Sequence, residues 1–409
     1  MPSGAGRLAS LDAFRGFDIL VMTFVNYIAG MTGVPFFLQH ATADMDTFTL
    51  TDVVFPGFLF IVGVAIPLSL EKRLACGDPL PKILGRIAAR TAGLLFLGVI
   101  MVNENDYSAA ATGLGKELWF FLAYAAVVVL WMSYPRTESP SRRRLYLGLR
   151  IAAAAALIAL AVIYRGQAGG PVHGLRPSWW GILGMIGWTY LAASLVYLAV
   201  RGKRTSLMGA LGFMVALYIG GRHGALDFLG PVNDFVGIGN IFGSHTAIVT
   251  AGMLVGSLFT PRSPALSHRC KMGSMAVFGA TLLFSGFLLR PLHGFSKIHG
   301  TESYCLATAG VCCLLFVLFY WLMDVQNLRS WAAFLRPVGT NPLIAYIMPS
   351  VLILLFGFAG RLLHADVSRI FWPSWERGGA AGLLNATAMT GLVLLLTWAL
   401  TKAGIILKV

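Results

Sequence analysis

Apolar residues fill long, nearly uninterrupted runs along this chain, and polar residues gather in the stretches between them. A membrane-spanning helix needs about 20 mostly apolar residues, because its backbone polar groups must be satisfied within the helix. Twelve segments fit, the shortest being 205–220, and an even number agrees with the loop charges below. They are 11–30, 52–71, 83–103, 117–134, 146–164, 180–200, 205–220, 243–260, 273–290, 304–323, 341–360 and 382–402. The pattern predicts an all-α fold, a polytopic transmembrane helix bundle of ten to twelve spans that forms a single integral-membrane domain over 1–409.

Composition supports this fold class and excludes others. Hydrophobic residues make up 57% of the 409 residues, charged residues only 12%, and the mean hydropathy is +0.75. A soluble domain carries about 25% charged residues, so this chain lacks the charge to cover a soluble surface. The net charge of +14 is better explained by loop residues that orient the spans than by nucleic-acid binding.

The basic residues also predict the orientation of the spans. Alternate loops and the two ends of the chain hold 20 Lys and Arg, whereas the other set of loops holds nine. Because basic residues are enriched in cytoplasmic loops, both termini are predicted to be cytoplasmic. Seven of the eight His fall in the outer loops, which indicates polar chemistry or binding there, unless these loops are simply longer and more polar.

The first span carries polar residues on one helical face. Asp12, Arg15, Met22 and Asn26 follow helical spacing, and Arg15 can pair with Asp12 or with Asp18. Arg15 and Asn26 are separated by about 16 Å of helix rise. Ionisable groups within a membrane face protein or water, so this face is predicted to line a path across the membrane. Alternatively, Asp12 and Arg15 lie at the headgroups and Asn26 serves packing.

The first outer loop contains His40 and ends at Asp52, which is predicted to cap the second span. Carboxylates flank His40 and could orient one of its ring nitrogens, as His-based acid–base catalysis requires. The alternative is a solvated or structural loop His.

Other polar residues cluster near span ends. Arg86 and Arg90 are four residues apart at the start of the third span, where they either hold phosphates or anchor the helix. Asn103 closes that span. A dense polar segment with Lys297 and Glu302 separates two late spans and is predicted to form one wall of the functional site.

Two further features have mainly structural explanations. Asn341 precedes Pro342 at a helix start, so it either serves the site or caps the helix. Gly252 and Gly256 form a GxxxG motif, which indicates close helix packing more often than dimerisation. The sequence lacks a Walker A motif, a G-x-G-x-x-G motif and a metal-binding C-x-x-C or H-E-x-x-H pair.

An ordered set of short motifs resembles the heparan-α-glucosaminide N-acetyltransferase family, and in particular its bacterial branch with a domain of unknown function. The resemblance is carried by the motifs at 11–16, 25–27, 40–41 and 52–63, by Trp179–Tyr190, and by Arg90, Asn103, Lys297, Ser303, Tyr304, Asp324, Gly339, Asn341 and Tyr346. The segment 117–164 is predicted to form an extra helical hairpin in addition to the family core.

The resemblance implies a transmembrane acyltransferase that moves an acetyl group from cytoplasmic acetyl-CoA to a glucosamine-type amine outside the cytoplasm, in a bacterial inner membrane. It implies His40 and Asn26 as catalytic residues, with Asp52 orienting His40. Cosubstrate contacts are then expected from Arg15, Arg86, Arg90 and Asn341, and acceptor contacts from Asp12, Lys297, Glu302 and Asn103. The expected partners are a glycan acceptor and membrane lipid, with a homodimer as a further candidate, and no metal or nucleic acid.

Two other functions fit the same sequence pattern. The first is a transporter or permease for amino sugars or cell-wall fragments, which would use the outer polar face without chemistry. The second is a non-catalytic membrane partner of a polysaccharide export system.

Overall fold

A computed structural model describes residues 8–167, 169–263, 266–364 and 378–407. Within these ranges the regular structure is helical and no β-strand occurs. Each of the twelve predicted spans corresponds to a helix. They are α1 (Ala9–Ile28), α2 (Leu50–Ala75), α3 (Leu80–Val102), α5 (Lys116–Trp131), α6 (Pro140–Ile163), α7 (Ile182–Ala199), α8 (Arg204–Arg222), α10 (Thr246–Gly256), α11 (His268–His293), α12 (Glu302–Tyr320), α14 (Pro342–Leu363) and α16 (Gly379–Lys402). The all-α prediction is therefore confirmed.

Nine helical segments in the described ranges are long and apolar enough to cross a membrane. The other three predicted spans fall short for different reasons. α1 contains Asp12, Arg15 and Asp18, α5 has only 16 residues, and α8 is diluted by four Gly. The chain is thus a multi-pass membrane protein, and a count of twelve spans stays a prediction.

Short elements modify several of these helices. The segment predicted at 243–260 begins with a π-helix, η3 (Gly239–His245), and ends with a 3-10 turn, η4 (Ser257–Phe259). α12 continues into a second π-helix, η5 (Trp321–Val325). The remaining short elements are η1 (Phe36–Leu38), α4 (Ala109–Thr112), η2 (Asp227–Leu229), α9 (Gly230–Val236), η6 (Ser330–Leu335) and α13 (Arg336–Thr340).

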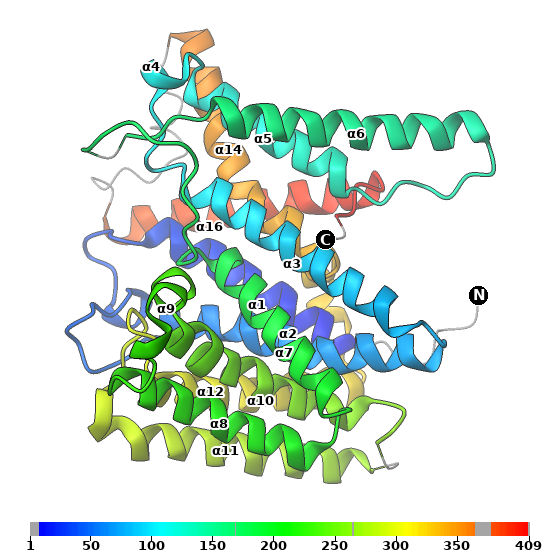
Figure 1. Cartoon of the computed structure of the whole chain (residues 1–409), viewed down its shortest axis with the longest axis vertical. Helices are drawn as coiled ribbons and strands as arrows, with labels where there is room; N and C mark the ends of the chain where they lie inside the picture. The colour runs from blue at the N-terminus through cyan, green and yellow to red at the C-terminus, as the bar shows by residue number, and fades with distance from the viewer. Residues whose placement is uncertain (1–7, 168, 264–265, 365–377, 408–409) are drawn as a thin grey trace. The chain divides into compact units, whose positions relative to one another are not determined.

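The chain divides into two compact units. The first comprises 1–25, 35–92 and 185–339, and the second comprises 26–34, 93–184 and 340–409. In the first unit, α8, α10, α11 and α12 pack side by side, and α10 also packs along α2 (Figure 1). In the second unit, α5 and α6 form a hairpin in which the Trp119 indole donates a hydrogen bond to the Leu160 carbonyl at 3.1 Å (Figure 1).

Glycine permits the closest helix contacts in the first unit. A Cβ on Gly252 would lie 2.2 Å from the Phe60 carbonyl oxygen, and one on Gly256 would lie 2.3 Å from that of Val64. Because backbone atoms cannot yield at such distances, only Gly allows α10 to approach α2 this closely. The GxxxG motif therefore packs helices within one chain, as predicted.

The start of α1 is capped by a distant residue. The backbone N–H groups of Ala9 and Ser10 donate to the two Asp324 carboxylate oxygens at 3.2 and 3.0 Å. A carboxylate at this position satisfies N–H groups that have no partner within the helix and complements the helix dipole. Asp324 thereby fastens α1 to η5 inside the first unit.

Candidate active site

Two loops of the first unit meet at the N-terminal end of α2. One loop leads into α2 and carries His40, and the other connects α11 to α12 and carries Lys297. Asp46 joins them, because its carboxylate accepts hydrogen bonds from the Arg290 side chain at 2.9 Å and from the Phe295 backbone at 2.6 Å. The Phe295 hydrogen bond is the main reason that the pKa of Asp46 is lowered. These hydrogen bonds of Asp46 to Arg290 and Phe295, called the Asp46 clasp below, hold Lys297 beside the loop of His40.

The N-terminus of α2 shows why Asp52 points into this site. The helix begins at Leu50, so the N-cap is Thr49 and Asp52 is the third helical residue. The Thr49 backbone N–H donates to Asp52 Oδ2 at 3.1 Å, which completes a capping box. The prediction that Asp52 itself is the cap is therefore corrected by three residues, because the side chain reaches back to the N-cap instead of preceding the helix.

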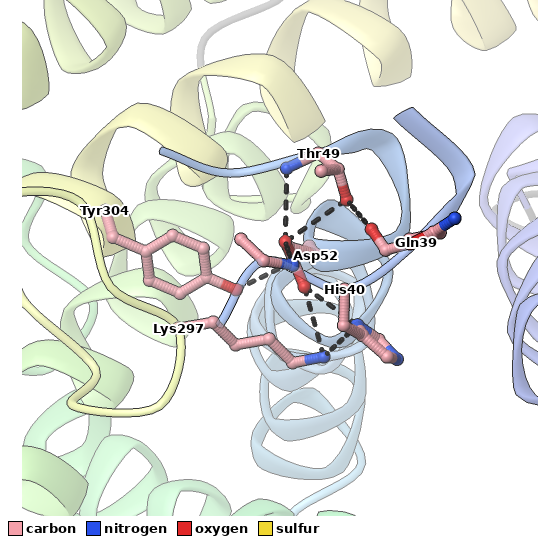
Figure 2. A network of polar contacts seen from close by, with 7 residues as sticks. Gln39, His40, Thr49, Asp52, Lys297 and Tyr304 are labelled. Carbon is pink, nitrogen blue, oxygen red and sulfur yellow. Dashed lines mark hydrogen bonds and ion pairs between the residues drawn. The ribbon is translucent and has the colours of Figure 1, made fainter. Parts of the chain in front are cut away.

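Asp52 is the centre of the polar network in Figure 2. Its side chain is fully buried, and Oδ1 lies 2.8 Å from His40 Nδ1 and 3.4 Å from Lys297 Nζ. Oδ2 accepts a hydrogen bond from the Ala41 backbone at 3.1 Å in addition to the one from Thr49. A buried carboxylate needs such donors, because an unpaired charge away from water is costly.

The ring of His40 is placed so that one nitrogen stays available. Nδ1 contacts both Asp52 Oδ1 and Lys297 Nζ, each at 2.8 Å. One ring nitrogen cannot donate to the carboxylate and accept from the ammonium at once. In the tautomer in which Nδ1 donates to the buried Asp52, Lys297 Nζ pairs with Asp52 Oδ1 instead of the ring, and Nε2 is the basic nitrogen on the opposite side of the ring (Figure 2). The His40 side chain is 36% exposed, so part of the ring is open to an incoming group.

Lys297 is a partly buried cation beside the buried carboxylate. Its side chain is 24% exposed. Burial lowers the pKa of Lys297, and the neighbouring Asp52 carboxylate opposes this shift. The ammonium thus balances the negative charge of Asp52. The resemblance implies an acceptor contact for Lys297, and the structure places this residue beside His40 and Asp52.

Thr49 and Tyr304 complete the support of this cluster. The Thr49 hydroxyl lies 2.6 Å from the Gln39 carbonyl, next to His40, and the Tyr304 hydroxyl donates to the Asp52 backbone carbonyl at 2.6 Å (Figure 2). Thr49 was missed by sequence analysis. Its signal was the T-x-x-D spacing before an apolar run, which is typical of a capping box.

Two other predicted site residues contact groups within the protein. Glu302 is fully buried and lies 2.9 Å from His293 Nδ1. Asn103 donates to the carbonyls of Val99 and Arg176 at 2.8 and 2.9 Å. Both side chains thus contact groups of the protein itself, and their contacts with the acceptor stay a prediction.

Asn341 stands at the N-cap position of α14 but does not cap it. Its amide donates to Thr401 and to the Ile405 carbonyl, and its oxygen accepts from the Leu407 backbone. The side chain is fully buried and ties the C-terminal segment to α14. The side chain therefore does not cap α14, and its contact with the cosubstrate stays a prediction.

The polar face of α1 does not form one continuous site in the described contacts. Arg15 lies 3.6 Å from Asp12 and donates to the Gly339 carbonyl at 3.3 Å. Asn26 is exposed near the end of α1 and belongs to the second unit. It is not among the residues that the His40 network joins.

The two predicted phosphate ligands of α3 have different surroundings. Arg86 pairs with Asp78 at 2.6 Å, so part of its charge is already neutralised. Arg90 lies over the Tyr190 ring, 4.8 Å from its centroid. A guanidinium that stacks on an aromatic ring keeps its N–H edges for a phosphate, which fits Arg90 better than Arg86.

The fold and this cluster define a multi-pass membrane protein with a buried carboxylate, an accessible His and a Lys at one end of a helix bundle. The chain belongs to the family described as "Domain of unknown function (DUF5009)", whose model matches residues 7–227. This range includes His40 and Asp52, whereas Lys297 lies beyond it.

Two curated proteins are also similar to part of the chain. Heparan-alpha-glucosaminide N-acetyltransferase of Mus musculus is 40% identical over 103 residues, which are 25% of this chain and 15% of the mouse protein. The Homo sapiens protein of the same name is 40% identical over 99 residues, which are 24% of this chain and 14% of the human protein. The matched segment thus spans about one-seventh of each relative, and it supports the resemblance that the motifs indicated.

Proposed function

We propose that this protein is a transmembrane acetyltransferase, which transfers an acetyl group from acetyl-CoA to the amine of an amino sugar. The observation that carries the proposal is the contact of His40 Nδ1 with Asp52 at 2.8 Å, in a His side chain that is 36% exposed. Carboxylate-held His residues act as general bases in acyl transfer. The partial similarity to N-acetyltransferases names this reaction class.

The cluster supports a specific sequence of proton movements. The acceptor nitrogen attacks the thioester carbonyl of acetyl-CoA, and His40 Nε2 removes a proton from that nitrogen. Asp52 stabilises the imidazolium through Nδ1. As the new C–N bond replaces the C–S bond, the proton on Nε2 passes to the sulfur and free CoA thiol leaves. A transient acetyl group on Nε2 is the two-step form of the same transfer.

The cosubstrate contacts follow from the charged groups of the first unit. Arg90 is the residue best placed to bind a phosphate, and Arg15 and Arg86 add positive charge. Asn26 is proposed to donate a hydrogen bond to the oxygen that becomes negative during transfer. Asp12 stays a proposed acceptor contact.

The proposed topology has twelve spans, cytoplasmic termini, acetyl-CoA entering from the cytoplasm and acceptor at the opposite face of a bacterial inner membrane. Cys76 follows α2 and Cys270 lies in the first turn of α11; both are exposed and at helix ends predicted to be cytoplasmic. A membrane-impermeant maleimide should label them only after cells are opened, whereas a His299→Cys variant should be labelled in intact cells. Labelling of Cys76 in intact cells would reverse the topology.

The function is tested by CoA thiol release from the purified protein with acetyl-CoA and a panel of amino sugars. We expect sugar-dependent release by the wild type and by a His364→Asn control, whose Asn suits the left-handed backbone of this exposed position. His40→Ala should abolish it. Full release by His40→Ala would refute the mechanism. No release with any amine, together with uptake of amino sugar into proteoliposomes, would indicate a transporter.

A further inference from the structure

A cavity of about 460 Å³ lies in the first unit, and none of its lining residues belongs to the His40 cluster. Its wall is apolar and comes from the end of α2, the start of α3 and the end of α7, with Leu74, Leu80, Leu84, Leu195 and Leu198 among its lining. Leu80 and Leu195 are 53% and 44% exposed, so the apolar wall is open to the outside. Its volume lies in the range of ligand sites, about 300–1,000 Å³.

A buried carboxylate organises the polar edge of this cavity. Glu71 is 4% exposed, and its two oxygens are held by the Tyr197 hydroxyl at 3.0 Å and by Arg262 Nε at 2.9 Å. Arg262 itself is 60% exposed. The ion pair neutralises Glu71 and holds the Arg262 guanidinium at the edge of the cavity.

Arg201 adds an unbalanced positive charge at the same edge. It lines the cavity and its side chain is exposed. No side-chain partner of Arg201 occurs among the residues that the structure describes. Its φ of 52° lies in the left-handed region, which is unfavourable for a residue other than Gly, Asn or Asp. Strained backbone of this kind often marks a functional position.

The surrounding loops strengthen the positive charge. The segments 71–86, 199–204 and 257–272 contain many Lys and Arg, whereas their only carboxylates are Glu71 and Asp78. Glu71 is paired with Arg262, and Asp78 is paired with Lys82 and Arg86. A ligand whose apolar chain fills this cavity would therefore place its polar end against basic residues.

From this arrangement we infer that the cavity binds one acyl chain of an anionic phospholipid, whose phosphate is recognised by Arg201 and Arg262. Basic pockets between membrane helices bind acidic headgroups in this way. A zwitterionic headgroup would bring its own cation against Arg201, so it should bind less well. The inference does not rest on the proposed acetyl transfer.

The test is native mass spectrometry of the full chain in detergent with phosphatidylglycerol or phosphatidylcholine of identical acyl chains. We expect preferential binding of phosphatidylglycerol. Arg201→Gln and Arg201→Gly should each reduce this preference about fivefold, as expected for the loss of one basic contact. The Gly variant also relieves the backbone strain. Arg142→Gln, which removes an exposed Arg from the basic first turn of α6, is the matched control and should bind like the wild type.

Two further arms make the inference falsifiable. Leu84→Trp should reduce binding of both lipids, because Leu84 lines the cavity and the larger ring fills it. Melting temperatures in detergent establish that each variant is folded, and Glu71 and Arg262 stay unchanged so that the buried pair is retained. Equal binding of the two lipids, or an unchanged preference in both Arg201 variants, would overturn the inference. Displacement of phosphatidylglycerol by free CoA would instead assign the site to a nucleotide phosphate.

Discussion

Replacement of Asp52 by Asn tests the proposed chemistry most directly. The carboxylate accepts from Ala41 and Thr49 on Oδ2 and faces His40 and Lys297 on Oδ1. An amide whose oxygen keeps the Oδ2 contacts turns its NH₂ group toward His40 Nδ1. A donor at this position requires an unprotonated Nδ1, which moves the proton to Nε2 and removes the base. We expect thiol release to fall by roughly 10³–10⁴-fold, the scale known for a wrong-tautomer His.

The same substitution should lower stability. Asn removes the negative partner of Lys297, which is 3.4 Å away and 24% exposed, and replaces charge-assisted hydrogen bonds worth about 1.5–3 kcal/mol each. Partial exposure lets water compensate some of the loss, so a decrease of about 2–4 kcal/mol in the free energy of unfolding is expected. Thermal unfolding in detergent measures this change.

Two companion variants separate chemistry from folding. Asp44→Asn changes an exposed carboxylate of the same loop and should leave both readouts unchanged. Asp52→Asn combined with Lys297→Met removes the unpaired ammonium, so it should recover part of the stability but none of the activity. The reasoning is refuted if folded Asp52→Asn keeps more than about a tenth of wild-type release, since a misplaced proton costs orders of magnitude.

Three other predictions address the loops and the packing. Burial lowers the pKa of Lys297, and Asp52 partly opposes this shift. The pH dependence of Lys297 labelling by an amine reagent, measured by peptide mass spectrometry, should therefore have its midpoint below pH 10.5. The midpoint should be lower still in Asp52→Asn, which removes the opposing charge. Asp46→Ala should speed amide exchange at Phe295 about tenfold, or about 1.4 kcal/mol. Because the Asp46 pKa is below its ordinary 3.8, the wild type keeps this clasp above pH 3.8 and loses it only on further acidification; unchanged exchange would contradict the clasp. Gly339→Ala should lower stability by about 1–3 kcal/mol, since a Cβ would lie 1.9 Å from the Asp12 carbonyl oxygen, whereas Gly273→Ala, in open space, should not; equal melting temperatures would argue against the close contact.

Hydrophobic patterning predicted the helices well because each helix is a local structure. A helix occurs in each of the twelve predicted apolar segments, including 205–220, which is α8, whereas the short helices α4, α9 and α13 were not predicted. The π-helix at Gly239–His245 was missed, since its register depends on packing: the Ser244 hydroxyl donates to the Gly300 carbonyl at 2.5 Å.

The sequence predicted some residues of the candidate site better than others. His40 and Asp52 were singled out from a loop–helix pattern, and the structure places them 2.8 Å apart. Glu302, Asn103 and Asn341 look equally polar in the sequence, yet each satisfies groups of the protein itself. Sequence shows that a polar group must find partners when it is buried, but it does not show which partners it finds.

The sequence by itself thus determined the class of this protein, because apolar length and loop charge act locally along the chain. The meeting of His40 with Lys297, 257 residues apart, was decided only by tertiary structure. It depends on the Asp46 clasp and on the packing of α11 and α12. Contacts at such separation arise from how helices pack and where their loops are tied, and neither property is contained in the periodicity of any one segment.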